Sequence, residues 1–211
     1  MVVDLSKYSL EKLRTGEEFV LYRGRGEGAL SPVLIVTPAS EHPAAKSLQR
    51  LEHEFNLRGE LDPAWAAQPI ACVRDEGRTK LVLRDPGGEP LDRFLGAPMD
   101  LNWFLRLAVK LAVALGQVHR RGLVHRDLKP ANILLDRAAD TIWLTGFGIV
   151  GRSAPEGQPR EIPEVIAGTL AYMAPEQTGR MNRETDSRSD LYFFGRDPLR
   201  DAYRIAPVHG N

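Results

Sequence analysis

One stretch of sequence decides the fold of this chain: His125-Arg126-Asp127-Leu128-Lys129-Pro130-Ala131-Asn132. A carboxylate such as that of Asp127 can accept or orient the proton of an attacking hydroxyl group. The ammonium of Lys129 can lie against a phosphate group, and the amide of Asn132, five residues after the aspartate, can bind a magnesium ion. Eight residues in this order rarely arise by chance, so we expect the stretch to form a catalytic site.

The composition sets broad limits on the class of protein. The chain has 211 residues, 43% of them hydrophobic, which is enough for one core or two small lobes. Its net charge is +0, so we expect neither nucleic acid nor an anionic membrane surface as a partner. Cys72 is the single cysteine, which excludes an internal disulfide and a cysteine-based metal cluster. No apolar run approaches the roughly 18 residues of a membrane span, and the first residues lack a signal-peptide layout, so we expect a cytoplasmic protein.

The first part of the chain predicts five strands and one helix. Alternating apolar residues bounded by glycine and proline mark the strands, and an apolar stripe marks a helix over 44–58, after the third strand. The predicted strands are Tyr8–Leu13, Phe19–Gly24, Val33–Thr37, Pro69–Arg74 and Thr79–Arg84.

A Gly- and Pro-rich segment, Asp85 to Pro90, then interrupts the pattern, as a hinge between two lobes would. A short helix over 91–95 and a long helix over 101–121 follow, with Asp100 as the N-cap of the long helix. Two small strands over 133–135 and 141–145 come next, and residues 146–176 have the composition of a loop.

This order of elements, with the catalytic loop at 125–132, resembles a protein kinase domain. The segment from Gly168 to Glu176 resembles the part that seats a peptide substrate. The resemblance implies an α+β, protein-kinase-like two-lobed fold, with a five-stranded antiparallel sheet plus one helix in the N-lobe and a truncated, mainly helical C-lobe. The expected divisions are 1–85 for the N-lobe, 86–195 for a partial C-lobe and 196–211 for an atypical tail.

The same resemblance implies roles for individual residues, with ATP and Mg²⁺ as cofactors. Asp127 matches the catalytic base and Lys129 the lysine that neutralises the phosphate. Asn132 matches the magnesium-binding asparagine, while Gly16 and Glu54 match residues of the nucleotide site. Further matches are Asp190, which braces the catalytic loop through its backbone amides, Thr169, which orients the substrate hydroxyl, and His125, which packs rather than titrates.

Two positions depart from the kinase pattern. Val36 stands where the lysine of the third strand is expected, so Glu54 has lost its cationic partner. Gly146 stands where the metal-binding aspartate of the Asp-Phe-Gly motif is expected, and glycine offers only backbone to a hard cation. Gly16 is the one glycine retained in the phosphate-covering loop, since Arg14 and Phe19 occupy the other positions. We therefore expect phosphotransfer to be impaired.

The last part of the chain adds two expectations. Residues 177–183 resemble the kinase domain at the N-terminus of large bacterial signalling proteins that carry an ATPase, sensor domains and a histidine kinase. Pro198 would interrupt a helix that begins near Ser189, so we expect a truncated domain, no arginine partner for Glu176, and exposed apolar surface on the long helix.

Three functions remain open from the sequence. The first is ATP-dependent phosphorylation of Ser or Thr in a protein substrate. The second is a catalytically inactive pseudokinase scaffold that binds a regulatory protein partner. The third is a truncated relic without a retained role. Asp127, Lys129 and Asn132 support the first, whereas Val36 and Gly146 support the second.

Overall fold

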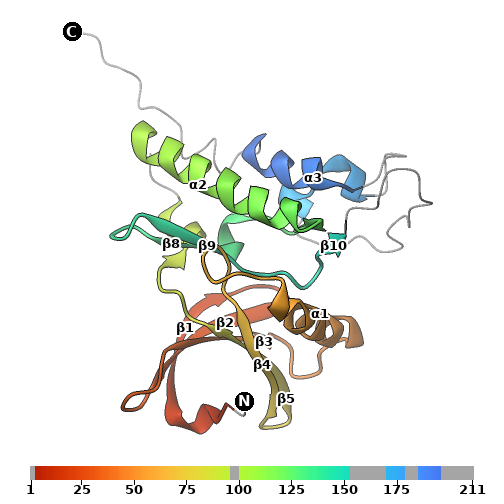
Figure 1. Ribbon diagram of the computed structural model, residues 1–211. Coiled ribbons are helices and arrows are strands. Elements are labelled where there is room, and N and C mark those ends of the chain that lie inside the picture. Colours follow the sequence, from red (N-terminus) through yellow and green to blue (C-terminus); the bar gives the residue numbers. More distant parts are fainter. Residues whose placement is uncertain (1–2, 96–99, 153–169, 179–184, 196–211) are drawn as a thin grey trace.

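The structure is a computed structural model that describes residues 3–95, 100–152, 170–178 and 185–195. A β-sheet with one helix forms one lobe, and the long helix α2 lies across the other, with a small sheet between them (Figure 1). This is the expected two-lobed, kinase-like α+β fold. Position 169 and the tail 196–211 lie outside the described residues, and the lobe boundaries at 85/86 and 195/196 stay predictions.

The N-lobe sheet has five antiparallel strands in the order β1-β2-β3-β5-β4. Helix α1, Ala45–Asn56, follows the third strand, as predicted, and buries Leu51 in an apolar cluster with Leu21 and Leu81 of the sheet. The strands are β1 Tyr8–Thr15, β2 Phe19–Gly26, β3 Val33–Pro38, β4 Pro69–Asp75 and β5 Arg78–Arg84.

Strands β1 and β2 are longer than the sequence predicted: β1 continues to Thr15, where the hairpin closes, and β2 continues to Gly26, opposite Tyr8. The N–H of Gly16 donates to the carbonyl of Phe19 at 2.9 Å, and pairing continues from Thr15 to Tyr8. Helix α1 is shorter than predicted: it ends at Asn56, and the chain continues as a single 3-10 turn, Leu57–Gly59.

Helix α2, Leu101–Arg120, organises the second lobe. The carboxylate of Asp100 accepts a hydrogen bond from the N–H of Trp103 at 2.9 Å, which confirms the predicted N-cap. Its buried side chains, such as Leu111 and Leu115, pack in one cluster with Leu135. The other elements are β6 Glu89–Pro90, β7 Leu123–Val124, β8 Ile133–Asp136, β9 Thr141–Leu144, β10 Gly151–Arg152, α3 Ser187–Leu191 and 3-10 turns at Leu5–Lys7, Leu91–Phe94, Pro130–Asn132, Leu170–Tyr172, Pro175–Thr178 and Tyr192–Gly195.

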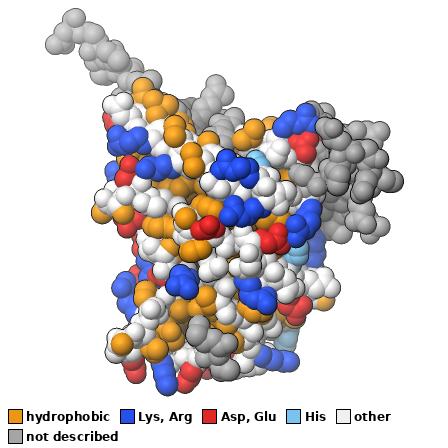
Figure 2. All heavy atoms as spheres, in the orientation of Figure 1, with side chains coloured by type: hydrophobic (Ala, Val, Ile, Leu, Met, Phe, Trp, Pro, Cys, Tyr) orange, Lys and Arg blue, Asp and Glu red, His pale blue; other side chains and the backbone are white. Residues whose placement is uncertain are grey.

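The opposite face of α2 carries exposed apolar side chains at intervals of four residues, and exposed apolar surface on this helix was predicted. Leu101, Leu105, Val109 and Val113 are 49–63% exposed. Hydrophobic side chains are visible along this helix at the surface (Figure 2). Helix α2 also reaches the length and mean hydropathy, 1.3, of a membrane span, although the sequence has no unbroken apolar run of that length. The core helix of a soluble protein can meet the same criterion, so this single helix is weak evidence for a membrane-spanning segment.

A buried ion pair holds the predicted hinge against the sheet. The guanidinium of Arg23 on β2 donates to Asp85 at 2.6 Å and to Glu89 at 2.7 Å, and also to the carbonyl of Gly88. The side chains of Arg23 and Asp85 are only 8% and 3% exposed. Because these contacts join residues more than 60 positions apart, they fix the path of the chain between the lobes.

Candidate active site

The catalytic loop brings together the three side chains that the sequence singled out. The ammonium of Lys129 lies 2.8 Å from Oδ2 of Asp127. A 3-10 turn, Pro130–Asn132, returns the chain so that Nδ2 of Asn132 donates to the backbone carbonyl of Asp127 at 2.8 Å and to its Oδ2 at 3.0 Å. The loop therefore presents a carboxylate whose orientation is held by an ammonium and an amide.

Asp190 of α3 holds the backbone of this loop. Its carboxylate accepts the backbone N–H groups of His125 and Arg126, each at 2.8 Å, and contacts Nε2 of His119 at 2.8 Å. Arg126 has a φ of 66°, a left-handed conformation that non-glycine residues rarely adopt. A buried acceptor for two successive amides compensates for this backbone strain, in agreement with the predicted bracing role of Asp190.

His125 is part of the packing around the loop. Its side chain is fully buried, its Nε2 lies 3.0 Å from the carbonyl of Thr145, and its ring packs 4.7 Å from that of Phe147. Burial lowers the pKa of His125, so the ring is kept neutral. The structural role predicted for this histidine is confirmed.

Glu54 is buried on α1, with 4% exposure, and faces the Gly146–Phe147 backbone. Burial raises the pKa of Glu54 to about 7, while the backbone N–H groups of Phe147 and Gly146 oppose the rise. Its Oε1 has no hydrogen-bond partner among the described residues. Val36, where a lysine was expected, lies half-buried in β3 beside the apolar cluster. The predicted loss of a cationic partner for Glu54 agrees with this arrangement.

Gly146 adopts a φ of +79° beside Asn132. A Cβ at this position would lie 2.6 Å from Nδ2 and 2.7 Å from Cγ of Asn132, so the Asn132 side chain fills the space. Nδ2 of Asn132 is committed to Asp127, which leaves Oδ1 as its oxygen for a cation. No group of three or more His, Cys, Asp or Glu side chains within the described ranges could hold a metal ion. Asn132 thus offers one amide oxygen to a cation, and position 146 offers no carboxylate.

Gly16, the predicted nucleotide-loop residue, lies in the β1–β2 turn. Its added Cβ would come within 3.0 Å of the Phe19 carbonyl, so glycine suits the tight hairpin. The structure shows this role of Gly16 in the hairpin. Its role toward a nucleotide stays a prediction.

The substrate-seating segment is described from position 170 onward. The side chain of Gln177 donates to the carbonyl of Arg126 at 2.7 Å and accepts the N–H of Ala174 at 2.9 Å, so this segment is tied to the catalytic loop. Glu176 accepts a hydrogen bond from the hydroxyl of Ser189 at 2.6 Å. Within the described residues, this carboxylate therefore has a hydroxyl partner.

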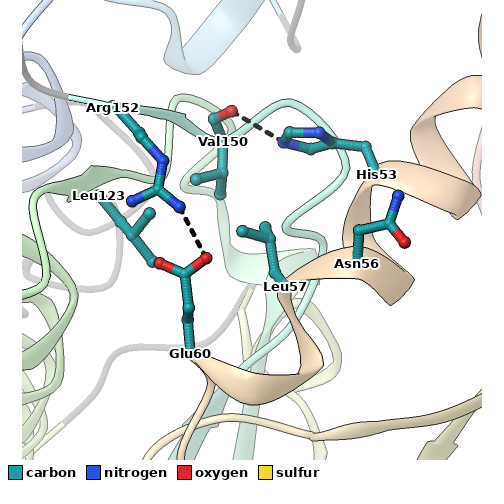
Figure 3. Close-up of a pocket in the computed structure, with 7 residues that line it drawn as sticks. All are labelled: His53, Asn56, Leu57, Glu60, Leu123, Val150 and Arg152. Carbon is teal, nitrogen blue, oxygen red and sulfur yellow. Dashed lines mark hydrogen bonds and ion pairs between the residues drawn. The ribbon is translucent and has the colours of Figure 1, made fainter.

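A cavity of about 230 Å³ lies between the C-terminal end of α1 and the residues after Gly148. On one side His53 contacts the carbonyl of Val150 at 3.0 Å, and on the other Arg152 lies 2.8 Å from Glu60 (Figure 3). Its lining includes none of the predicted site residues. The cavity marks the contact between α1 and the chain after Gly148, rather than a substrate site.

Arg14 lies close enough to Asp92 and Asp127 to feel their charge, a proximity that the sequence did not predict. It was noted only as a replacement for a glycine, yet its Nε is buried without a hydrogen-bond partner in the described part of the chain. Burial lowers the pKa of Arg14, whereas the nearby carboxylates of Asp92 and Asp127 raise it. The available signal was a charged residue at the first glycine position of the predicted phosphate-covering loop.

Comparison with known proteins gives consistent matches. Residues 39–196 match the protein kinase domain family. The chain is 37% identical over 121 residues to the serine/threonine-protein kinase Pkn1 of Myxococcus xanthus, covering 56% of this chain and 17% of that protein. It is 30% identical over 158 residues to the serine/threonine-protein kinase pkn2 of the same organism, covering 73% of this chain and 19% of that protein. It is 41% identical over 117 residues to the DNA damage-responsive serine/threonine-protein kinase RqkA of Deinococcus radiodurans, covering 54% and 17%. The matched region is therefore less than a fifth of these three relatives' lengths.

Proposed function

The chain belongs to the protein kinase family, and from this premise we propose that it is a Ser/Thr-type protein kinase domain with slow phosphotransfer to a protein substrate. The observation that carries the proposal is the intact catalytic loop, in which Lys129 and Asn132 both contact the carboxylate of Asp127. Relatives that are named serine/threonine-protein kinases support the same assignment.

The proposed roles follow from the chemistry of each side chain. Asp127 accepts or orients the proton of the substrate hydroxyl, because its carboxylate is held in place by two donors. Lys129 offsets the negative charge of the transferring phosphate, and Gly16 lets the hairpin backbone cover the nucleotide. Protein kinases as a family use ATP with Mg²⁺; Asn132 would hold the ion, which when bound neutralises charge on the phosphate oxygens.

Two features support the slow rate. Val36 supplies no positive charge, so Glu54 is buried without the ion pair expected of it. Gly146 supplies no carboxylate, and Asn132 fills the space beside it. Loss of several kcal/mol of transition-state stabilisation corresponds to several orders of magnitude in rate, at about 1.4 kcal/mol per factor of ten.

A second candidate function is a pseudokinase that acts by binding a regulatory protein partner. The specific observation in its favour is Glu54, whose pKa of about 7 and unpartnered Oε1 suit packing better than nucleotide positioning. A truncated relic is the remaining alternative and has no such observation of its own. The two main functions differ in whether any phosphate is transferred.

Transfer of labelled phosphate from ATP to casein, with and without Mg²⁺, tests the proposal. We expect slow labelling of serine or threonine that is abolished in Asp127→Asn, a variant that keeps the size of the side chain. Labelling that persists equally in Asp127→Asn would point to a contaminating kinase and contradict the proposal. ATP binding without any labelling would favour the pseudokinase.

The cellular setting belongs to the same proposal. We place the protein in the cytoplasm, with a protein substrate or regulatory protein as its partner, and with neither nucleic acid nor a membrane. The net charge of +0 supports the last two points. Placement at the N-terminus of a larger bacterial signalling protein stays a prediction. Fractionation of the native protein, with detection of its full length, would test both the location and the larger chain.

A further inference from the structure

Arg14 and Val36 lie in one row across the N-lobe sheet. Arg14 of β1 pairs with Leu21 of β2, and Leu21 pairs with Val36 of β3. Side chains of directly paired residues in antiparallel strands lie on the same face of a sheet. Leu21 and Val36 both pack in the cluster that contains Leu51 of α1, so this row faces α1. A charged side chain therefore stands two strands from the position where the expected lysine is missing.

An irregularity in β1 sets the direction of Arg14. Lys12 pairs with Tyr22 and Arg14 with Leu21, so Leu13 is an extra residue in the pairing. Such a bulge bends the strand and re-aims the side chains beside it. Leu13 is buried, at 4% exposure, in the same cluster as Leu21. The bulge thus allows the side chains of Leu13 and Arg14, although consecutive, to lie on the same face of the sheet.

The guanidinium of Arg14 faces charge from the opposite lobe. Burial lowers the pKa of Arg14, and the carboxylates of Asp92 and Asp127 act against this lowering. Asp92 follows the hinge, and Asp127 lies in the catalytic loop. Its Nε is inaccessible to solvent and donates no hydrogen bond to any described residue. A buried donor without an acceptor is costly, so an acceptor that enters between the lobes and reaches this group would be bound favourably. The planar fork of arginine suits phosphate oxygens.

We propose that Arg14 contacts the phosphates of a nucleotide bound between the lobes and replaces the cation that Val36 does not supply. The inference rests on the proposed function, since it concerns the same cleft. It adds a phosphate-binding residue from the first strand, at a position where a kinase ordinarily has glycine. An opposite arrangement, in which Arg14 occupies the cleft and excludes nucleotide, predicts the reverse effect of substitution.

Binding of ATP and of adenosine to the full 211-residue chain, measured by isothermal titration calorimetry, separates these outcomes. Arg14→Met keeps the aliphatic stem and removes the charge. We expect it to weaken ATP binding about tenfold to a hundredfold, as the loss of a charge-assisted contact would, and to leave adenosine binding unchanged. Adenosine lacks phosphate, so it reports on the integrity of the rest of the site.

Three further variants complete the test. Arg25→Met, on exposed Arg25 of the neighbouring strand β2, should bind ATP as the wild type does. Arg14→Met combined with Val36→Lys should regain ATP affinity, because the cation returns from the third strand. Arg14→Lys, which keeps the charge without the fork, should lie between the wild type and Arg14→Met.

Unchanged or tighter ATP binding by Arg14→Met would overturn this inference alone, as would an equal loss of adenosine affinity. A wild-type chain that binds no ATP and transfers no phosphate would overturn the proposed function together with it. The two failures are therefore distinguishable.

Discussion

The side chain of Asn132 occupies the space that a Cβ on Gly146 would need. The Asn132 amide nitrogen lies 2.6 Å from that Cβ position and is held there by two hydrogen bonds to Asp127. The amide of Asn132 thus contacts both position 146 and the proposed base, Asp127. Glycine in place of the aspartate expected at 146 therefore changes the packing beside the catalytic loop, in addition to removing a possible metal ligand.

Gly146→Ala should destabilise the protein more than the same substitution at a glycine with a similar φ elsewhere. Gly28 has a similar φ, +65°, but nothing lies within 4 Å of its added Cβ, so Gly28→Ala isolates the backbone cost of about 1–2 kcal/mol. We expect Gly146→Ala to cost at least about 1 kcal/mol more, because Asn132 must leave its contacts with Asp127. Urea unfolding of both variants measures the difference. Equal losses would mean that Asn132 rearranges freely.

Glu54 should make the stability of the protein depend on pH. Its folded pKa of about 7 exceeds the ordinary value of 4.5, so the folded state holds this proton more tightly. The stabilising contribution is full below about pH 4.5 and is lost as pH rises through about 7. The loss amounts to about 3 kcal/mol at most, at 1.36 kcal/mol per pH unit.

Glu54→Gln should therefore flatten this dependence and raise stability at pH 8 relative to the wild type. Urea denaturation at pH 5.5 and pH 8 gives the two free energies of unfolding. Glu52→Gln, at an exposed position of the same helix, should retain the wild-type slope. If Glu54→Gln keeps that slope as well, the charge of Glu54 is solvated in the folded protein.

Asp190→Ala should loosen the catalytic loop. It leaves the buried N–H groups of His125 and Arg126 without an acceptor, at a cost of about 3–5 kcal/mol. Hydrogen exchange at these two amides should accelerate, and thermal unfolding should begin at a lower temperature. Glu11→Ala is the control, because the exposed pair of Glu11 with Arg25 contributes less than about 1 kcal/mol. Protected amides in Asp190→Ala would show that another group holds the loop.

Arg23→Ala should weaken the contact between the sheet and the hinge. Its removal leaves the carboxylate of Asp85, 3% exposed, without its cation, and we expect a loss of about 3–5 kcal/mol. Arg25→Ala removes an arginine two residues away on the same strand, whose pair with Glu11 is exposed, and should cost less than about 1 kcal/mol. Chemical denaturation measures the free energy of unfolding of both variants. Similar losses would show that the contacts of Arg23 with the hinge do not stabilise the protein more than an exposed ion pair does.

Sequence patterns were sufficient for the order of the elements and for the local part of the site. The alternating strands, the apolar stripe of α2 and its Asp100 cap are properties of neighbouring residues, and all three appear in the structure. Asp127 and Asn132 meet because a single 3-10 turn separates them. Strand and helix ends were less well predicted, since hairpin closure at Gly16 depends on the partner strand.

The sequence by itself determined the kinase-like order of elements, the catalytic loop and the two departures at Val36 and Gly146, because each depends on residue identity or short spacing. Only the tertiary structure decided how the site responds to those departures. It aligned Arg14 with Val36 through strand register and buried Glu54 away from water. Register and burial depend on contacts between distant segments, and the charge state of a side chain follows the solvent and charges around it.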